Sequence, residues 1–314
     1  ISENAKEKTE VELRKMVAYA YGNVLLAEEN FKIVNSNITL IEKNVSDLKK
    51  VYENGLIEQE SVQQLQLTLS SLKSNQSYVK RLDKIARQMF NNALGLDLDS
   101  VVELTNNLGQ LVGMYTSLTP LESVVELENV VGYKIALNDL KSKELLLKLE
   151  KSKALPTLNA FINGGYLGNN DSFDFLNTSQ KWFGLSLVGV SMRIPVFSSG
   201  MRIAATKRAK INLEQSRDNL IETEQIIKLE ILKAKSAYKF AIEKYKNNQK
   251  NLRLAERIEK KNQIKFFEGI NSSFDLRQAQ TQLYKSQQEL LQSMLDVINK
   301  KAELETALNQ VPKN

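Results

Sequence analysis

The chain has 314 residues, of which 42% are hydrophobic and 25% charged, as in ordinary folded proteins. It contains no Cys and no His, which excludes disulfides, thiol catalysis and Cys-ligated metals and removes the commonest general base, so neither an enzyme nor a bound cofactor is expected. Its 43 basic and 37 acidic residues give a net charge of +6, but the two signs are interspersed, which indicates a solvated helical surface without the one-sided basic face of a nucleic-acid-binding protein.

Two stretches lack the strongest helix breaker. Pro occurs only at positions 120, 156, 195 and 312, so residues 1–119 and 196–311 are free to be helical. In the first stretch we expect a long helix, a turn at Gly55 and a return helix ending near Ala93. No segment approaches the ~20 apolar residues of a membrane-spanning helix.

A different texture separates the two helical stretches. After Pro156, polar Asn159 and Asn163 fall on one parity and apolar residues on the other, and a polar loop leads to the strand-rich run Trp182–Pro195. Two strands joined by a polar loop predict a β-hairpin over residues 157–195. Its strand length suits a transmembrane barrel, although a soluble hairpin packed on helices fits the same texture. Aromatics near the loop are placed for an interfacial girdle: Tyr166, Trp182 and Phe183.

The last third predicts one nearly continuous helix over residues 201–267, because Gly269 is the first Gly after Gly200. This helix would run roughly 100 Å at ~1.5 Å per residue, and it needs a partner along its length. We expect it to pack antiparallel against a helix beginning near Phe274. Steps of three and four mark the contact face: Ile227, Ile231, Ala234, Tyr238, Ala241, Tyr245, Leu252 and Ala255.

An internal repeat relates the two helical stretches at an offset of 214 residues. Tyr52–Leu56 aligns with Phe266–Ile270, and Ala93-Leu94 aligns with Ala307-Leu308. We therefore expect a first-repeat helical hairpin at 1–95, an inter-repeat linker at 96–120, and a second repeat at 121–311 that contains the β-hairpin 157–195 and a helical hairpin 201–310.

The offset leaves the β-hairpin without a counterpart, since its equivalent falls before residue 1. The sequence thus predicts that the chain begins partway through its first repeat and that the missing part carries another strand pair. Without that pair we expect the hairpin to be distorted, disordered or unnaturally paired, because an open strand edge is unstable in lipid.

Short motifs in a fixed order run through nearly the whole chain: Ala93–Gly95, Ala154–Leu158, Trp182–Leu187, Ile194–Gly200, Ala237-Tyr238, and Phe266–Gly269 followed by Asp275-Leu276. In their order, spacing and duplication they resemble the outer-membrane efflux protein family, the TolC-like channels. The resemblance implies a mainly α fold of long antiparallel coiled-coil helices that form a tunnel. The β-hairpin would belong to a trimeric outer-membrane barrel of twelve strands, four from each subunit.

The same resemblance implies the function and the partners. The protein would be a homotrimer in outer-membrane lipid that spans into the periplasm of a Gram-negative bacterium. It would be a passive exit duct of a tripartite multidrug efflux pump or of a type I secretion system. Its partners would be a periplasmic adaptor and an inner-membrane transporter. The protein itself would have no enzymatic activity and would bind no cofactor and no nucleic acid.

The resemblance also places the site at the two Gly turns, where Gly permits the φ > 0 geometry of a tight reversal. Asp275, six residues after Gly269, matches a carboxylate that constricts the tunnel mouth, although it also suits a helix N-cap or first-turn carboxylate. The next constriction position is the uncharged Gln278, so the family's closure network is only partly reproduced. The expected adaptor-docking tips are Asn54, Gly55, Leu56, Glu58, Glu268, Gly269, Ile270, Asn271 and Ser272.

Two other functions compete with the duct. A periplasmic scaffold coiled coil without transport activity explains the long helices but neither the run Trp182–Pro195 nor the repeat. A basic coiled coil that binds nucleic acid needs a one-sided Lys/Arg stripe, which the sequence lacks.

Overall fold

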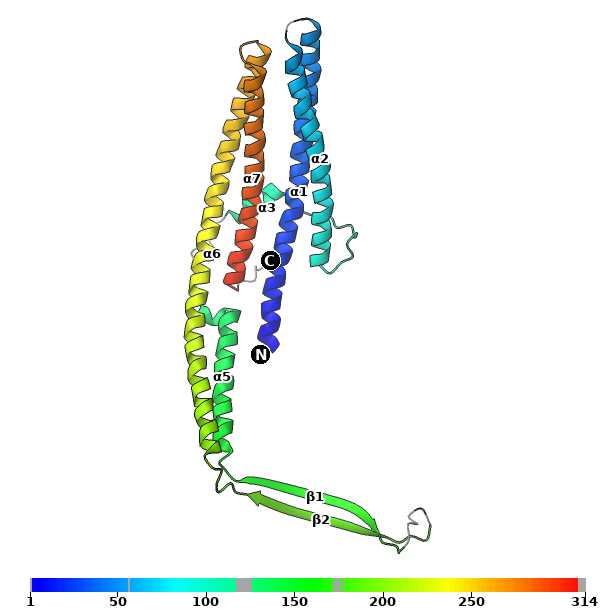
Figure 1. Cartoon of the computed structure of the whole chain (residues 1–314), viewed down its shortest axis with the longest axis vertical. Coiled ribbons are helices and arrows are strands. Elements are labelled where there is room, and N and C mark those ends of the chain that lie inside the picture. The colour runs from blue at the N-terminus through cyan, green and yellow to red at the C-terminus, as the bar shows by residue number, and fades with distance from the viewer. Residues whose placement is uncertain (1, 56, 117–125, 172–175, 177, 310–314) are drawn as a thin grey trace. The chain divides into compact units, whose positions relative to one another are not determined.

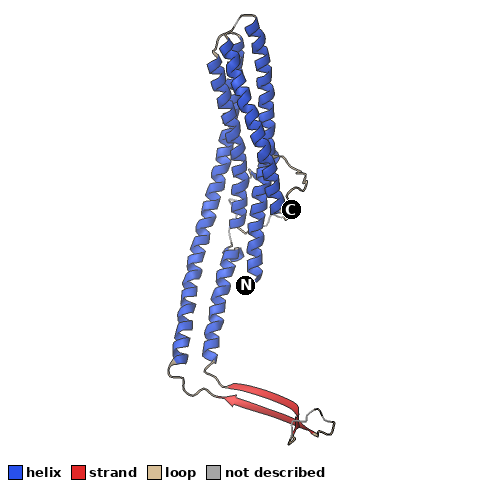
Figure 2. Ribbon diagram, turned by 45° about the vertical axis from the view of Figure 1, so that its right-hand side comes forward, coloured by secondary structure: helices blue, strands red, loops and turns tan. Residues whose placement is uncertain are grey.

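The computed structural model describes residues 2–55, 57–116, 126–171, 176 and 178–309. In this part the protein is mainly α with one antiparallel strand pair, as predicted (Figures 1 and 2). None of the described helices combines the length and the apolar content that a membrane-crossing helix needs. The elements are α1 (Ser2–Glu53), α2 (Gln59–Ala93), α3 (Leu108–Tyr115), the 3-10 turn η1 (Leu127–Asn129), α5 (Val131–Ser152), β1 (Thr157–Gly168), β2 (Trp182–Arg193), α6 (Met201–Phe267) and α7 (Ser273–Ala307).

The chain divides into two compact units. The helical unit comprises Ile1–Ile135 with Glu224–Asn314, and the hairpin unit comprises Ala136–Thr223. The helical unit contains α1, α2, α3, α7 and the C-terminal part of α6. The hairpin unit contains β1, β2, most of α5 and the N-terminal part of α6.

The prediction of one long helix over residues 201–267 is confirmed, since α6 runs unbroken from Met201 to Phe267. Its antiparallel packing against α7 is also confirmed. The Lys244 ammonium lies 2.9 Å from the Asp296 carboxylate, and the Asn248 amide donates to the Glu289 carbonyl at 2.9 Å. Residue numbers therefore rise along α6 while those of their partners fall along α7, as in a helical hairpin that reverses at Gly269.

Side-chain contacts also place α1 between α2 and α7. The Gln76 amide on α2 donates to Asn35 on α1 at 2.6 Å, and the Asn37 amide on α1 donates to Gln287 on α7 at 2.9 Å. In the helical unit, α1 and α7 therefore lie in the middle, with α2 and α6 at the sides (Figure 1). The two side helices are the open edges of this arrangement.

The predicted seam of α6 forms the main hydrophobic core of the helical unit. Ile227, Ile231 and Ala241 are buried there together with Tyr238, whose side chain is 0% exposed and whose hydroxyl donates to the Tyr115 carbonyl. These residues pack against Leu291, Val297 and Ile298 of α7 and against Leu108, Leu111 and Val112 of α3. The seam is therefore confirmed as the contact face of the long helix.

The expected linker carries a helix that the sequence did not predict. α3 occupies Leu108–Tyr115 and begins with a capping box between Asn107 and Gln110. It contains Gly109 and Gly113, which disfavour a helix by about 1 kcal/mol each. Burial of its apolar face against α7 offsets this cost.

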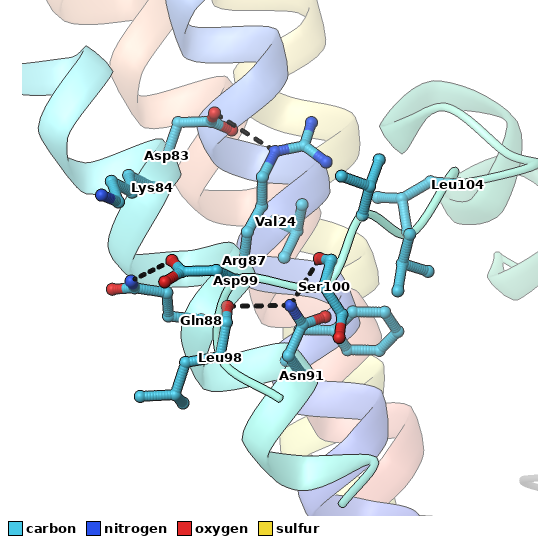
Figure 3. Close-up of a pocket in the computed structure, with 13 residues that line it drawn as sticks. Val24, Asp83, Lys84, Arg87, Gln88, Asn91, Leu98, Asp99, Ser100 and Leu104 are labelled. Carbon is cyan, nitrogen blue, oxygen red and sulfur yellow. Dashed lines mark hydrogen bonds and ion pairs between the residues drawn. The ribbon is translucent and has the colours of Figure 1, made fainter. Parts of the chain in front are cut away.

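A hollow of ≈ 390 Å³ lies where the linker leaves α2 (Figure 3). The side-chain amide of Asn91 donates to the carbonyls of Leu98, at 3.0 Å, and Ser100, at 2.7 Å, while Gln88 donates to Asp99 at 3.1 Å. These hydrogen bonds along the hollow hold the linker against α2, and we assign them this anchoring role.

In the hairpin unit, β1 and β2 pair along their whole length, from Thr157 opposite Arg193 to Gly168 opposite Trp182. In this register, partners of even number share one face of the hairpin. That face is almost entirely apolar and carries Leu158, Ile162, Val188, Val190 and Met192, all of them exposed. The other face carries Asn159 and Asn163, as the alternation predicted, together with exposed apolar residues: Phe161, Leu167, Phe183, Leu185 and Leu187.

The expectation that the hairpin is distorted, disordered or unnaturally paired is wrong for its described strands, which form twelve consecutive antiparallel pairs. Twelve consecutive backbone pairs and close cross-strand packing hold the hairpin together. The Phe161 ring lies over Gly189, where an added Cβ would come within 2.5 Å of the ring. A side chain at position 189 would therefore displace the Phe161 ring.

Candidate docking end at the two glycine turns

The two Gly turns lie at the same end of the helical unit (Figures 1 and 2). Since α1 and α7 are antiparallel neighbours, the end of α1 at Glu53 is close to the start of α7 at Ser273. Below the turns, the Gln263 amide on α6 donates to Asn44 on α1 at 3.1 Å. The structure thus brings together two turns that are 214 residues apart in sequence.

The repeat is visible in the geometry of these hairpins. α2 and α7 each have 35 residues, and both of their ends are related by the 214-residue offset. The positions that close these helices also correspond, because Gly95 has φ +72° and its equivalent Asn309 has φ +51°. Asn is among the residues that best replace Gly in the left-handed region, so the second repeat can carry Asn where the first carries Gly.

Both tip glycines have the positive φ that the sequence predicted, +74° at Gly55 and +72° at Gly269. At Gly269 the chain closes α6 with the two Schellman hydrogen bonds, from Gly269 N to Phe266 O and from Ile270 N to Lys265 O, at 3.0 and 2.8 Å. An added Cβ would meet nothing within 4 Å at either glycine. The preference for Gly therefore comes from the backbone conformation alone.

The first turn is held mainly by its own backbone. The Asn54 side chain donates to the Lys50 carbonyl at 2.7 Å, and Gly55 N donates to the Tyr52 carbonyl at 2.7 Å. Glu58 takes the N-cap position of α2 without a side-chain capping bond. Asn54 and Glu58 are exposed, whereas Leu56, the remaining docking residue predicted here, lies outside the described residues.

The second turn is more strongly tied. Ser272 and Asp275 form a capping box in which each side chain accepts a backbone N–H of the other, both at 3.2 Å. The Asn271 side chain, partly buried, donates to Asn262 on α6 at 2.7 Å. Glu268 and Ile270 project to the surface, so this turn offers both a charged and an apolar group.

The two residues predicted to constrict a pore lie on the first turns of α7. Asp275 and Gln278 are both exposed. Asp275 has the capping role that the sequence allowed as an alternative, and its place in a pore stays a prediction. Its carboxylate accepts hydrogen bonds through Oδ2, from the Ser272 backbone N–H and from the Ser272 hydroxyl at 2.7 Å.

Sequence reasoning predicted Ile270 as a docking residue but missed the other exposed apolar side chains around the second turn. Ile264, Phe267, Ile270 and Phe274 are all exposed there, and the Arg277 guanidinium lies 5.5 Å from the centroid of the Phe274 ring. Exposed apolar side chains at a helix tip are typical of a surface that binds another protein. The signal in the sequence was the presence of large apolar residues off the seam on both sides of Gly269.

Comparisons with known proteins agree with this architecture. A model of the outer membrane efflux protein family matches residues 139–310. No curated protein sequence matches the chain. Among solved structures, the outer membrane protein VceC from Vibrio cholerae is similar over 98% of this chain and 72% of its own, with a TM-score of 0.75 and 17% identity.

Two further solved structures share the fold. CusC, described for the conformational changes that accompany its transmembrane channel formation, has a TM-score of 0.77 at 18% identity and is covered over 70% of its length. The MtrE outer membrane channel of Neisseria gonorrhoeae in its open state has a TM-score of 0.73 at 15% identity and is covered over 68%. Both are similar over 98% of the present chain.

Proposed function

The chain belongs to the outer membrane efflux protein family, and on this premise we propose that it is a passive exit duct of a tripartite efflux pump or of a type I secretion system. The observation that carries the proposal is the β-hairpin, whose even-numbered face is apolar and exposed in a chain otherwise built of long helices. Strands of twelve residues are long enough to cross a bilayer core. In a periplasmic scaffold, this exposed apolar face would contact water and serve no function.

The hairpin would lie in the outer membrane. Its even-numbered face would turn to lipid. The mixed face that carries Asn159, Asn163 and Arg193 would turn to the interior, as alternate residues do in the strands of a membrane barrel. Tyr166 and Trp182 lie on the apolar face at the loop end of the strands, where an interfacial girdle would be, whereas Phe183 lies at the same end on the opposite face. The two unpaired strand edges would pair with other strands of the barrel, because lipid leaves no water to satisfy them.

We further propose a homotrimer closed through the two edge helices. On α2 an exposed apolar stripe follows steps of four, three and four, and consists of Tyr78, Leu82, Ile85 and Met89. On α6, exposed Ile226, Phe240 and Leu254 recur every fourteen residues, which is two heptads. The α2 stripe of one subunit would pack on the α6 stripe of the next, a head-to-tail contact that closes a ring.

Replacing Ile85 by Glu is expected to abolish the trimer. Burying an Ile side chain contributes ~1.5–3 kcal/mol, and the change removes this at each of three interfaces while adding a carboxylate that must be desolvated. The molar mass of the purified protein in detergent, measured by light scattering, is the test. Lys80→Glu, on an exposed part of α2 away from the stripe, is the control and should remain trimeric. An Ile85→Glu protein that stays trimeric contradicts this interface.

We propose that the end with the two Gly turns docks to a periplasmic adaptor, which connects the duct to an energised inner-membrane transporter. Exposed Asn54 and Glu58 would contribute from the first turn, and Glu268 and Ile270 from the second. The two turns lie side by side, so one adaptor tip can contact both. In a ring of subunits, Asp275 would then lie near the tunnel mouth, with the neutral Gln278 one helical turn further along α7.

The role of Asp275 is testable with two substitutions. Asp275→Asn removes the charge but keeps an oxygen for the Ser272 backbone N–H, whereas Asp275→Ala removes both. If carboxylates ring the mouth, both variants should raise conductance and weaken cation selectivity in planar bilayers, and the Ala variant alone should also lose thermal stability through the cap. Unchanged conductance and selectivity in both variants would exclude Asp275 from the constriction and show that it acts only in the helix cap.

A further inference from the structure

A buried polar cluster lies below the Gly269 turn, apart from the exposed docking residues. At its centre is Glu259 of α6, ten residues before Gly269, with 6% of its surface exposed. In the part of the chain that the structure describes, it is the one carboxylate residue that is buried, and no Lys or Arg lies within ion-pair distance of it. A carboxylate in this position has no cation to compensate for its desolvation.

The neighbours of Glu259 are polar but poorly paired. Gln280 of α7 is 1% exposed, and its amide lies beside the Glu259 carboxyl group. Tyr284, one turn further along α7, lies close enough for the Glu259 charge to act on its hydroxyl. Gln263, one turn after Glu259 on α6, bonds to Asn44 of α1. Buried atoms without a hydrogen-bond partner concentrate here: Glu259 Oε1, Gln280 Oε1 and Nε2, Tyr284 Oη and Asn44 Nδ2.

The charged groups around the cluster do not neutralise it. From α7 the titratable side chain facing Glu259 is Tyr284, and from α1 the buried residues at this level are Ile41, Asn44 and Leu48, none of which ionises. On α6 itself, the nearest charges in sequence are all exposed: Glu256, Arg257, Lys260 and Lys261. The state of Glu259 is therefore governed by burial and by its amide and phenol neighbours.

We infer that Glu259 makes the packing of α6 against α7 and α1 below the Gly269 turn dependent on its protonation. In the neutral form the carboxyl O–H donates to Gln280 Oε1, and the three helices stay closed. When the proton passes to water, the carboxylate needs donors. The Gln280 amide supplies one through Nε2, and water must enter between the helices to supply the rest. Ionisation thus loosens this segment, and protonation closes it.

The direction of the pH dependence follows from burial. Desolvation raises the pKa of Glu259 above its ordinary value of 4.5, although the Gln280 amide partly opposes this. The packed state therefore binds the proton more tightly than the opened state. Its stability is fully present below pH 4.5 and falls as the pH rises through the higher pKa of the packed form. Burial and the Glu259 charge raise the pKa of Tyr284, so its phenol stays a donor throughout.

Amide hydrogen exchange of the full chain, followed by mass spectrometry over residues 252–285, tests the inference. After correction for the intrinsic pH dependence of exchange, protection of this segment should fall as the pH rises above 4.5 and through the raised pKa of the packed form. Glu259→Gln, which mimics the neutral form, should keep high protection at every pH. Glu256→Gln, an exposed carboxylate one turn earlier, is the matched control and should behave like the unsubstituted chain.

Glu259→Leu is the second variant, in case the Gln amide finds no partner and weakens the helices by itself. It leaves no polar atom to desolvate and should also show protection that is independent of pH. Two results would overturn the inference: constant protection in the unsubstituted chain, or a fall with pH that persists in both Glu259 variants. Because the readout is local packing, it is independent of whether the protein forms a duct.

Discussion

Replacement of Tyr238 by Ala is expected to lower the free energy of unfolding of the helical unit by about 3–5 kcal/mol. Tyr238 is fully buried at the centre of the core formed by α3, α6 and α7, and its hydroxyl bonds to the backbone carbonyl of Tyr115. The substitution leaves a large cavity and an unsatisfied carbonyl.

Chemical denaturation in detergent measures this effect, with each substitution made in the Ile85→Glu background, which is expected to be monomeric. Tyr238→Phe keeps the ring and should cost only about 1–3 kcal/mol, the price of leaving the Tyr115 carbonyl unpaired. Phe240→Ala, two residues along α6 and exposed in the monomer, is the control for removing an aromatic side chain and should cost less than about 1 kcal/mol in this background. Equal losses for Tyr238→Ala and Phe240→Ala would show that the core is not centred on Tyr238.

The same residue predicts sensitivity to alkali. Burial raises the pKa of Tyr238 to about 12, whereas the phenol ionises near its ordinary 10.0 in the unfolded chain. The folded protein therefore binds this proton more tightly, and the stability it contributes is lost as the pH rises above 10.0 towards 12. In Tyr238→Phe this part of the alkaline destabilisation should be absent.

Much of the fold was predictable because a few residues carry strong local constraints. The absence of Pro and Gly between Met201 and Phe267 left no interruption for α6, and the seam centred on Tyr238 identified its buried face. Gly55 and Gly269 marked the reversals, since few other residues adopt their positive φ. The alternation after Pro156 predicted the hairpin and its two faces.

The features that were missed depend on tertiary contacts. α3 contains two glycines and is too short to be stable alone, so it forms only because its apolar face has α7 to pack against. Glu259 is one of many charged residues in a helix, and its burial becomes evident only when α1 and α7 close over it. The apolar rim at Phe267 and Phe274 was hidden because apolar residues in a helix are ordinarily read as core.

At the docking end, replacement of Gly269 by Val is expected to abolish transport that depends on the adaptor. A β-branched residue at φ +72° is strained by at least ~1–2 kcal/mol. Open space around the position offers no compensating contact. The strain is relieved if Ile270 and Asn271 leave their bonds to the Lys265 carbonyl, which dismantles the turn that would present Glu268 and Ile270 to the adaptor.

Gly269→Asn separates the shape of the turn from its surface. Asn tolerates positive φ, as Asn309 already does at φ +51° in this chain, so the turn should survive with an added polar side chain. Transport of a reporter compound and binding of the adaptor should therefore be largely retained in the Asn variant and lost in the Val variant at equal expression. If Val supports full transport, the conformation of this turn is not needed for docking. If Asn fails as completely as Val while its stability is unchanged, the adaptor contacts the Gly269 surface directly, because the new side chain then blocks a contact that the intact backbone would still present.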